Sequence, residues 1–567
     1  MKPRFLLFAW IYFLIYSLLL ALPLSSQSIV KADNPSPTVQ AGDPPTPIPT
    51  LLPGARFNRR VTLPYNAYVW QLIRWPNNVV DCVLIIEHEG NPSEAEITQN
   101  CTNQVLTIYK NSTVCPGWDN NGDLTDCKGE YFRRGATIPR VRIIQGNFAP
   151  PSTWIVLTGC NPVAGYRNQC ASLPSLEIHG EEPIPTEKIW KIEGFLNGVP
   201  FRCNQNPCNL TLSETSPKGV RVDFWASSTL GDDSEHDFAL VRIIPLNKVP
   251  GNLLESVIPE WVVDILSSQL HGPAPASCAD IWYVFPDLSG PPDWLSRKNE
   301  NISLVSTEPL ALLAGMLIQT GNVDAKDCPS GGLLPTNAAN TCGLEKAKDE
   351  VSLWQNQFND EILQAAQTND IPPYLIKNIF IQESQFWPGT YTNDLEAGLG
   401  QLTEGGADTL LMWNQDFYNG FCANIFSMEG CALGYARLGK EERRILRGAL
   451  LKKVNASCIN CKNGIDLEKA RFSINVFAAG LRASCFQTGQ VMFNVTKKLA
   501  GQSISYEDLW KFTLVDYNAG SGCLDTALRA VNTASKPLNW ANVSNALEEA
   551  CKGAIGYVEN ASQVTKK

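Results

Sequence analysis

Residues 381–388, with the sequence I-Q-E-S-Q-F-W-P, carry the feature that determines the fold of the C-terminal part of this 567-residue chain. They follow Asp370 and two nearby prolines, a pattern that predicts a helix start, since aspartate caps helices and proline is tolerated in the first turn. Apolar residues then recur at helical spacing, which places Glu383 on the same face as Ile379 and Phe380. A carboxyl group held against apolar surface has a raised pKa, as a general acid for glycoside cleavage requires.

Two further segments follow in order, A-G-L-G-Q-L at residues 397–402 and D-Y-N-A-G-S-G at residues 516–522. Together, the three segments resemble the soluble lytic transglycosylase domain, a mainly bacterial family with a lysozyme-like fold that cleaves the glycan strands of peptidoglycan. In that family, Glu-Ser precedes an aromatic residue and a proline, and a Gly-Leu-Met-Gln element starts 15 residues after the glutamate. Here Phe386 and Pro388 take those places, and Gly398 lies 15 residues beyond the glutamate.

The resemblance covers roughly residues 345–535, with three departures. Gly400 stands where the family usually has methionine, and Leu395 stands where a glycine often precedes the motif. In addition, 115 residues separate Gln401 from Tyr517, which is longer than the usual gap. The first two departures alter the floor and rim expected for a sugar groove, so they leave the subsite preference open.

The resemblance implies that Glu383 is the sole catalytic acid/base. It would protonate the glycosidic oxygen between N-acetylmuramic acid and N-acetylglucosamine, and would then accept the proton of the C6 hydroxyl as that oxygen closes on C1. The product is a 1,6-anhydro sugar, formed without water. One carboxylate suffices because the nucleophile is intramolecular, whereas a conventional glycosidase needs a second. No cofactor and no metal are implied.

The resemblance also implies a set of substrate-binding residues. Ser384 would position the helix end and contact a sugar, Gln401 would hydrogen-bond an acetamido group, and Tyr517 would hydrogen-bond near the catalytic acid. Gly398 and Leu399 would shape the floor of the groove, and Asn518 would order the facing loop. The full set is Ser384, Gly398, Leu399, Gln401, Tyr517 and Asn518. From the residues themselves, Gln401 is alternatively a helix-capping amide and Tyr517 a core tyrosine with a satisfied hydroxyl.

Two other functions fit the same residues. The first is a hydrolytic muramidase on the same fold, which needs a second carboxylate. The candidates for it are Asp394, Glu396, Glu404 and Asp408. The second is a non-catalytic cell-wall-binding or adhesion protein whose lysozyme-like domain grips glycan without cleaving it.

The N-terminus predicts export. Residues 1–32 have the pattern of a signal peptide or signal anchor, with Lys2 and Arg4 before an apolar run at residues 5–24 and small residues near Ala32. The run is long for a signal-peptide core, and about 20 apolar residues can span a bilayer, so membrane anchoring is an alternative to cleavage. We expect the rest of the chain to be extracytoplasmic, secreted or anchored at the cell envelope.

The pattern along the chain predicts a multi-domain protein. A proline-rich linker at residues 33–54 precedes β-rich, sandwich-like modules at 55–183 and 184–250, where short β-type runs alternate with turn signals. A connecting region at 251–340 shows little sign of its own core. Residues 341–567 read as mainly α-helical, and by the resemblance form the lysozyme-like catalytic domain.

The 18 cysteines are natural in an oxidising compartment. Ten precede residue 341 and eight follow it, so each half can pair internally. Cys203 and Cys208 bracket a tight N-Q-N-P turn, which predicts a disulfide-clipped hairpin. Four cysteines that have zinc-like spacing are read as disulfides because the chain is predicted to be exported. These are Cys422, Cys431, Cys458 and Cys461.

Charge and ligand-type residues limit the remaining partners. The net charge of −10 argues against a nucleic acid bound by bulk electrostatics. The chain has four histidines and none beyond His271, which argues against histidine-based metal chemistry in the C-terminal half. The segment from Asp119 to Asp126 has alternating oxygen ligands and Glu130 at the twelfth position, as in calcium loops. Because Leu124 replaces the required glycine, a plain polar turn is the favoured interpretation.

Overall fold

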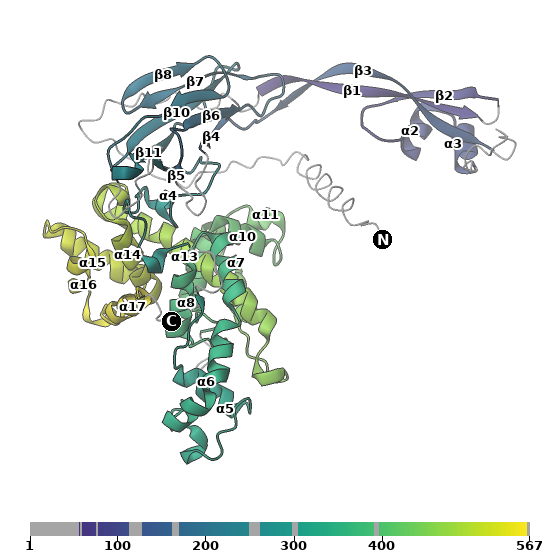
Figure 1. Ribbon diagram of the computed structural model, residues 1–567. Helices are drawn as coiled ribbons and strands as arrows, with labels where there is room; N and C mark the ends of the chain where they lie inside the picture. The colour runs from purple at the N-terminus through teal and green to yellow at the C-terminus, as the bar shows by residue number, and fades with distance from the viewer. Residues whose placement is uncertain are drawn as a thin grey trace.

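The computed structural model describes Arg56 and residues 59–74, 77–112, 128–160, 169–248, 261–297, 304–389 and 396–563. Strands dominate up to residue 266, and helices make up the regular structure from residue 279 to residue 561 (Figure 1). This confirms the predicted order of a β-rich N-terminal part and a helical C-terminal part. The predicted signal segment, the proline-rich linker and the candidate calcium loop at Asp119–Asp126 lie outside the described residues.

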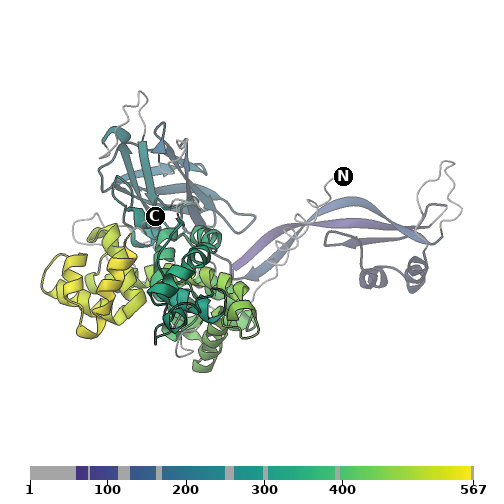
Figure 2. The ribbon, with the colours of Figure 1, turned by 60° about the horizontal axis from the view of Figure 1, so that its bottom comes forward.

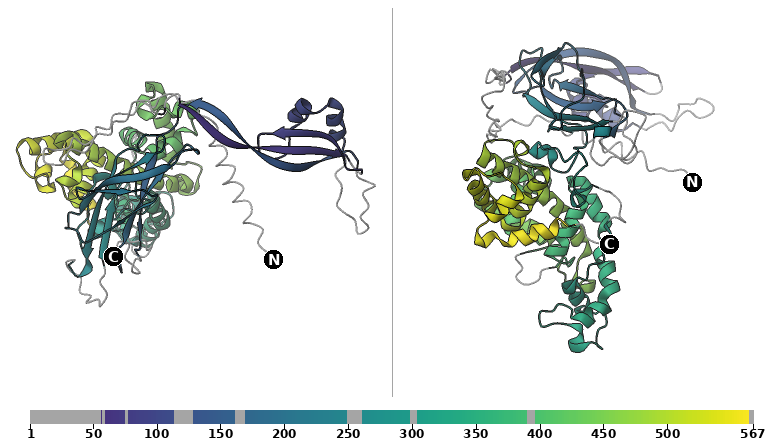
Figure 3. Two further views of the ribbon diagram at one scale, coloured as in Figure 1. Left: turned by 90° about the horizontal axis from the view of Figure 1, so that it is seen from above. Right: turned by 60° about the vertical axis from the view of Figure 1, so that its left-hand side comes forward.

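A long arm projects from the body of the protein (Figures 1 and 2). Strands β1 (Arg59–Arg74) and β3 (Glu130–Gly146) pair antiparallel along their length, and β2 (Val79–Ile86) joins β1 at the far end. Helices α2 (Glu94–Asn100) and α3 (Asn103–Lys110) cover that end, where buried apolar side chains such as Leu72 and Ile97 form a small core. The left view of Figure 3 shows that the ribbon twists as it leaves the body.

The remaining strands form two sheets. One is six-stranded in the order β5-β12-β11-β10-β7-β8, and the other is three-stranded in the order β4-β6-β9. Their bounds are β4 (Ser152–Thr158), β5 (Gln169–Cys170), β6 (Ser175–Glu181), β7 (Ile189–Leu196), β8 (Val199–Cys203), β9 (Cys208–Thr211), β10 (Val220–Ser228), β11 (Asp237–Pro245) and β12 (Trp261–Leu266). Alternate side chains of both sheets meet in one core, including Ile155, Ile178 and Phe224.

This sandwich divides the chain differently from the sequence interpretation. The boundary expected at 183/184 falls between strands of the same sandwich, because β6 and β7 contribute to one core. Strand β12, from the expected connecting region, is an inner strand of the six-stranded sheet, between β5 and β11. The disulfide between Cys203 and Cys208 is confirmed, but the hairpin is wrong, since β8 pairs with β7 and β9 pairs with β6. The disulfide therefore joins the two sheets at a corner.

A buried ion cluster fixes the base of the arm to the sandwich. The guanidinium of Arg56 lies 2.7 Å from the carboxylate of Glu182 and 2.5 Å from that of Asp232. It also donates to the carbonyl of Ala149 at 2.6 Å. Bidentate arginine–carboxylate pairs of this kind fix geometry as well as charge. The arm and the sandwich are therefore held together at their junction.

The helical region contains α4 to α17, built around the long helix α13 (Leu467–Thr496). The others are α4 (Ala279–Trp282), α5 (Ala311–Gln319), α6 (Thr341–Asn356), α7 (Asn359–Asn369), α8 (Pro373–Glu383), α9 (Glu404–Trp413), α10 (Gln415–Cys422), α11 (Met428–Cys431), α12 (Lys440–Val454), α14 (Tyr506–Ala519), α15 (Ser521–Thr533), α16 (Trp540–Asn545) and α17 (Gly553–Ala561). Figure 1 shows α14 to α17 on one side of α13, and the right view of Figure 3 shows α5 and α6 extending away from the sandwich.

Helix α13 is apolar on more than one face, as expected of a helix surrounded by others. Ile474 and Phe477 contribute to a core shared with α7, α8, α14 and α17. Val476 and Ala479 contribute to a separate core formed with α9 to α12. The long gap between the second and third motifs is therefore largely a helical unit packed on the other side of α13.

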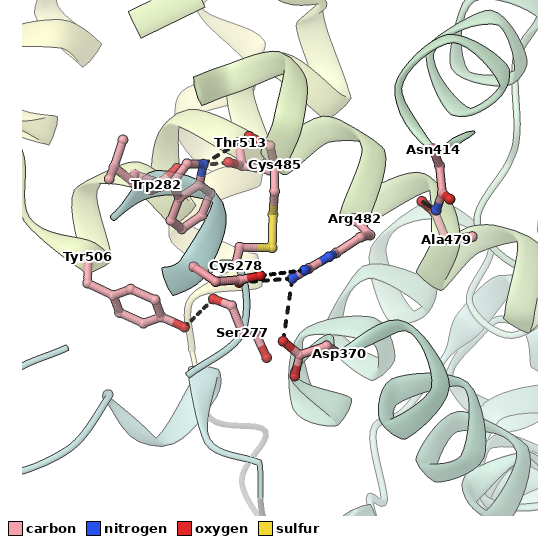
Figure 4. The surroundings of a disulfide bond; sticks show 12 residues. Ser277, Cys278, Trp282, Asp370, Asn414, Ala479, Arg482, Cys485, Tyr506 and Thr513 are labelled. Atoms are coloured by element: carbon pink, nitrogen blue, oxygen red, sulfur yellow. Dashed lines mark hydrogen bonds and ion pairs between the residues drawn. A yellow bond between two sulfur atoms is a disulfide. The ribbon is translucent and has the colours of Figure 1, made fainter. Parts of the chain in front are cut away.

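Two disulfides cross the expected division at residue 341. Cys278 pairs with Cys485 and Cys328 pairs with Cys342, so the expectation that each half pairs internally is wrong. Around the first pair, the indole of Trp282 donates to the Cys485 carbonyl at 2.9 Å (Figure 4). The connecting region thus supplies core residues to the helical region instead of forming a loose linker.

The other disulfides are local, and the cysteines at zinc-like spacing form disulfides. Eight disulfides lie within the described residues, a number that indicates an oxidising environment outside the cytoplasm. Cys422 pairs with Cys431 and Cys458 with Cys461. Across the described ranges, no cluster of potential metal ligands is found, and no helix has the length and apolar character needed to cross a membrane.

Candidate active site

Glu383 is the last residue of helix α8. The helix begins as predicted near the prolines, but the predicted cap is wrong: Pro372 is the N-cap residue, and Asp370 instead ends α7 with a left-handed φ of 54°. Asp370 interacts with Arg482 of α13 at 3.4 Å (Figure 4). The aspartate therefore fixes the turn between α7 and α8 as the C-cap of α7 and through its charge, and not as the N-cap of α8.

The environment of Glu383 favours its protonated form. Burial raises the pKa of its carboxyl group to about 7, and the negative charge of Glu396 acts in the same direction. The hydroxyl of Tyr557, on α17, opposes this shift. That hydroxyl is buried against the carboxyl group without a hydrogen bond of standard geometry. Near neutral pH, Glu383 is thus present in both protonation states, as an acid that later acts as a base requires.

The backbone after Glu383 is constrained. Gln385 and Phe386 both have left-handed φ values, 45° and 62°, which are unfavourable for residues with side chains. The Trp354 indole donates to the Phe386 carbonyl at 2.9 Å, and the Gln385 side chain accepts from the Leu312 backbone N–H at 2.8 Å. These contacts hold the strained segment in place, which positions the end of α8.

The second motif forms a tight loop facing this helix end. Ala397 and Leu402 pair across it, with a left-handed φ of 77° at Gly398. The side-chain amide of Gln401 donates to the Gly398 carbonyl at 2.8 Å. The backbone N–H of Leu399 donates to the Ser473 hydroxyl of α13 at 3.3 Å. The structure thus gives Gln401 a loop-bracing contact within its own motif.

The third motif reaches the second through one hydrogen bond. The Tyr517 hydroxyl donates to the Gly400 carbonyl at 2.8 Å, and its ring packs edge-on against Phe477 with centroids 5.3 Å apart. Burial, and then the charges of Glu383 and Glu396, raise the pKa of Tyr517. The three motifs therefore converge, although residues 383 and 517 are far apart in the sequence. Tyr517 braces the loop and also lies within electrostatic range of the acid.

The remaining predicted site residues take different positions. Ser384 is buried, and its hydroxyl donates to the Phe380 carbonyl at 3.2 Å, so it fastens the last turn of α8. Leu399 is fully buried and forms part of the core beneath the loop. Asn518 is exposed on the last turn of α14.

The absence of a methionine at position 400 has a steric explanation. A Cβ atom on Gly400 would lie 1.8 Å from the Phe477 ring, so this aromatic ring occupies the space next to the glycine. The ring in turn packs on Phe380 of α8, with centroids 5.0 Å apart. Phe477 thus joins the acid-bearing helix to the facing loop.

Substituting Gly400 with alanine is expected to destabilise the helical region by about 1–3 kcal/mol, because Phe477 has to move out of a packed core. Thermal unfolding measures the change. Gly405→Ala is the matched control: its Cβ would meet only the Thr403 hydroxyl at 3.8 Å, and alanine is favoured over glycine within α9. Equal stability losses in the two variants would contradict the steric role of Phe477.

Of the candidate second carboxylates, Glu396 lies near Glu383, whereas Glu404 and Asp408 are paired with an arginine elsewhere. Asp408 lies 2.8 Å from the guanidinium of Arg447 and Glu404 lies 3.3 Å from it, on the α9–α12 side. Glu396 is exposed at the start of the facing loop, and its charge acts on both Glu383 and Tyr517. Asp394 lies outside the described residues.

Three polar residues near the site, two buried and one partly buried, were not identified from the sequence. The partly buried residue is Tyr557 of α17, whose hydroxyl faces Glu383, and no spacing rule connects residues so far apart. Lys377 of α8 is buried and donates to the side chains of Asn356 and Asn359 at 2.7 and 2.8 Å and to the Leu304 carbonyl. Asp516 is buried beside Tyr517, and burial raises its pKa to about 7.

Comparison with known proteins does not identify a relative of this chain. No protein-family model matches the chain. No curated protein matches it, and no solved structure does either. The resemblance to lytic transglycosylases therefore rests on the three sequence motifs.

Proposed function

We propose that the helical region is a lysozyme-like peptidoglycan lytic transglycosylase in which Glu383 is the catalytic acid/base. The observation that carries the proposal is the convergence of the three motifs on one carboxyl group whose pKa is raised to about 7. This environment suits a residue that gives up a proton and takes it back within one catalytic cycle.

The proposed reaction needs no water. The protonated Glu383 carboxyl transfers its proton to the glycosidic oxygen as the bond from C1 of N-acetylmuramic acid to that oxygen breaks. The resulting carboxylate then takes the proton of the C6 hydroxyl, whose oxygen bonds to C1. Glu383 ends the cycle protonated, the leaving sugar carries the first proton, and the product has a 1,6-anhydro ring.

The loop of residues 396–402 forms the facing wall of the proposed substrate groove. Tyr517 and Gln401 fix its backbone, as their hydrogen bonds to Gly400 and Gly398 indicate. In this proposal these two residues position the loop, and the exposed Asn518 lies at its outer margin.

Product analysis tests the reaction type. Purified full-length protein is incubated with peptidoglycan sacculi, and the released fragments are examined by mass spectrometry. We expect anhydro ends, each lighter by one water than a hydrolytic product. Reducing ends would instead establish the hydrolytic muramidase. Sacculus binding without any cleavage would establish the non-catalytic wall-binding function.

The muramidase alternative is favoured by one observation, the proximity of the Glu396 charge to Glu383. In the transglycosylase, Glu396→Gln is expected to retain cleavage and to lower the pKa of Glu383, since a repelling charge is removed. The alkaline limb of the pH–rate profile then moves to lower pH. A loss of about 100-fold or more in rate would indicate that Glu396 takes part in the chemistry.

Tyr557 is expected to tune the acid. Tyr557→Phe removes a hydroxyl that favours the charged form of Glu383, so the pKa of Glu383 rises and the alkaline limb of activity moves to higher pH. Tyr418→Phe is the control, because it removes another buried hydroxyl, bonded to the Cys431 carbonyl within the α9–α12 core. A pH profile unchanged in Tyr557→Phe would show that the hydroxyl does not act on the acid.

A further inference from the structure

The proximal half of the arm, residues 59–67 of β1 with residues 138–146 of β3, is a two-stranded ribbon in which most side chains are exposed, although Val61 and Ala67 are buried. Strand β2 joins β1 only from Tyr68 onward, and β3 is an edge strand of this sheet. The unpaired backbone groups along the edges of such a ribbon promote aggregation unless the ribbon has a partner or is protected by charge.

One face of the ribbon carries neighbouring aliphatic side chains between the polar residues Arg60, Asn66 and Gln145. The register places Pro64 opposite Val141 and Thr62 opposite Ile143, so these four side chains share a face. Val141 is 68% exposed and Ile143 is 63% exposed, more than any other large aliphatic side chain in the described part of the arm. Val141 and Ile143 therefore form a small exposed apolar patch that is available for contact.

The same ribbon is strongly cationic. Residues 59–67 and 138–146 contain four arginines and no aspartate or glutamate, in a chain whose net charge is −10. They are Arg59, Arg60, Arg140 and Arg142. Arg60 pairs with Gln145 on the face that carries Val141 and Ile143, whereas Arg142 lies over the Tyr65 ring on the other face and Arg140 lies 3.3 Å from Glu87.

The partner of the ribbon has to accommodate both its arginines and its exposed aliphatic side chains. A second copy of the ribbon would bring together two cationic segments that carry no carboxylate of their own, which is unfavourable. A hydrophilic polyanion would pair with the arginines but would leave Val141 and Ile143 in water. An anionic lipid surface satisfies both groups, since its phosphates attract arginine and its acyl boundary accepts aliphatic side chains. The ribbon also begins shortly after the apolar run at residues 5–24.

We propose that this ribbon lies on an anionic lipid surface, with Val141 and Ile143 at the acyl boundary and the arginines among the phosphate groups. Long arginine side chains from the opposite face can reach around the edges of a two-stranded ribbon. This interaction is independent of the catalytic proposal, because the arm contains none of the site residues.

Hydrogen exchange in vesicles tests the interaction with the full chain. The protein is reconstituted into vesicles of phosphatidylcholine alone and into vesicles containing an equal amount of phosphatidylglycerol, so that any contribution of residues 5–24 is present in both. We expect backbone amides of the ribbon to exchange about tenfold more slowly, or more, in the anionic vesicles. Added salt should reduce this protection by screening the charges.

Two double variants should abolish the protection, Arg140→Gln with Arg142→Gln and Val141→Ser with Ile143→Ser. Val83→Ser is the control, since Val83 is 53% exposed but lies on β2 at the far end of the arm. Unchanged exchange of the sandwich strands reports that the variants are folded. Equal exchange of the wild-type ribbon in both vesicle types overturns the proposal. So does protection that grows with protein density in neutral vesicles, which would indicate self-association.

Discussion

Glu383→Gln is expected to lower the rate of glycan cleavage by about 10²–10⁴-fold, because glutamine can neither donate the proton to the glycosidic oxygen nor take one back. Release of muropeptides from sacculi measures the loss. In the wild type, activity should fall as the pH rises above about 7, where the carboxyl group ionises. A variant that clears sacculi at the wild-type rate would show that another group supplies the proton.

The same substitution should change the pH dependence of stability. Glu383 keeps its proton up to a pH of about 7 when folded, but its ordinary pKa in the unfolded chain is 4.5. Between these values the folded protein binds more protons, so the free energy of unfolding decreases as the pH rises through this interval. Glu383→Gln removes this penalty and should raise stability by about 1–3 kcal/mol at pH 8, relative to the wild type.

Asp516→Asn is the matched control for both measurements. Burial also raises the pKa of Asp516 to about 7, so its replacement should relieve a similar pH-dependent penalty. Asp516 interacts with Thr488 of α13, and its variant should therefore keep the alkaline limb of activity. If Asp516→Asn loses that limb, then Asp516 and not Glu383 sets the pH dependence of activity.

The second large effect is expected from the disulfide between Cys278 and Cys485, which joins residues 207 positions apart. Replacing both cysteines with alanine should lower the free energy of unfolding of the helical region by about 3–5 kcal/mol, because a long loop is no longer closed in the unfolded chain. Both residues are fully buried, so lost packing adds to the effect. Denaturant unfolding followed by far-ultraviolet circular dichroism measures the loss.

Cys458→Ala with Cys461→Ala provides the comparison for this measurement. That disulfide spans three positions, and Ile459 within it is 97% exposed. Loss of such a short loop closure should cost only about 1–2 kcal/mol. If the two pairs cost the same, the long-range disulfide does not act through the chain entropy of the unfolded state.

The sequence predicted the parts of the fold that depend on local pattern. The order of β-rich and helical parts follows from hydrophobic period, and the start of α8 follows from its prolines. The disulfide between Cys203 and Cys208 follows from its short spacing, but which sheets it joins depends on strand pairing. The domain division and the Cys278–Cys485 pair depend on contacts between distant segments, which periodicity does not report.

In the candidate site, too, the features that depend on local sequence were predicted and those that depend on distant residues were not. The raised pKa of Glu383 was expected from its position on an apolar helix face, and its environment in the fold has that effect. Its modulation by Tyr557 and Glu396 was not foreseen, because those residues approach it only in the folded chain. The role of Asp370 was also misjudged, since its partners Arg297 and Arg482 come from other parts of the sequence.

Helix α13 sets the alignment of the two halves of the site. Ser473 holds the facing loop, and Phe477, four residues later, contacts both that loop and α8. One inserted residue between these positions would turn one contact away by about 100° and separate the acid from its facing loop. Changes in chain length can therefore be accommodated before α13, where α9 to α12 lie, but not within this single helical turn.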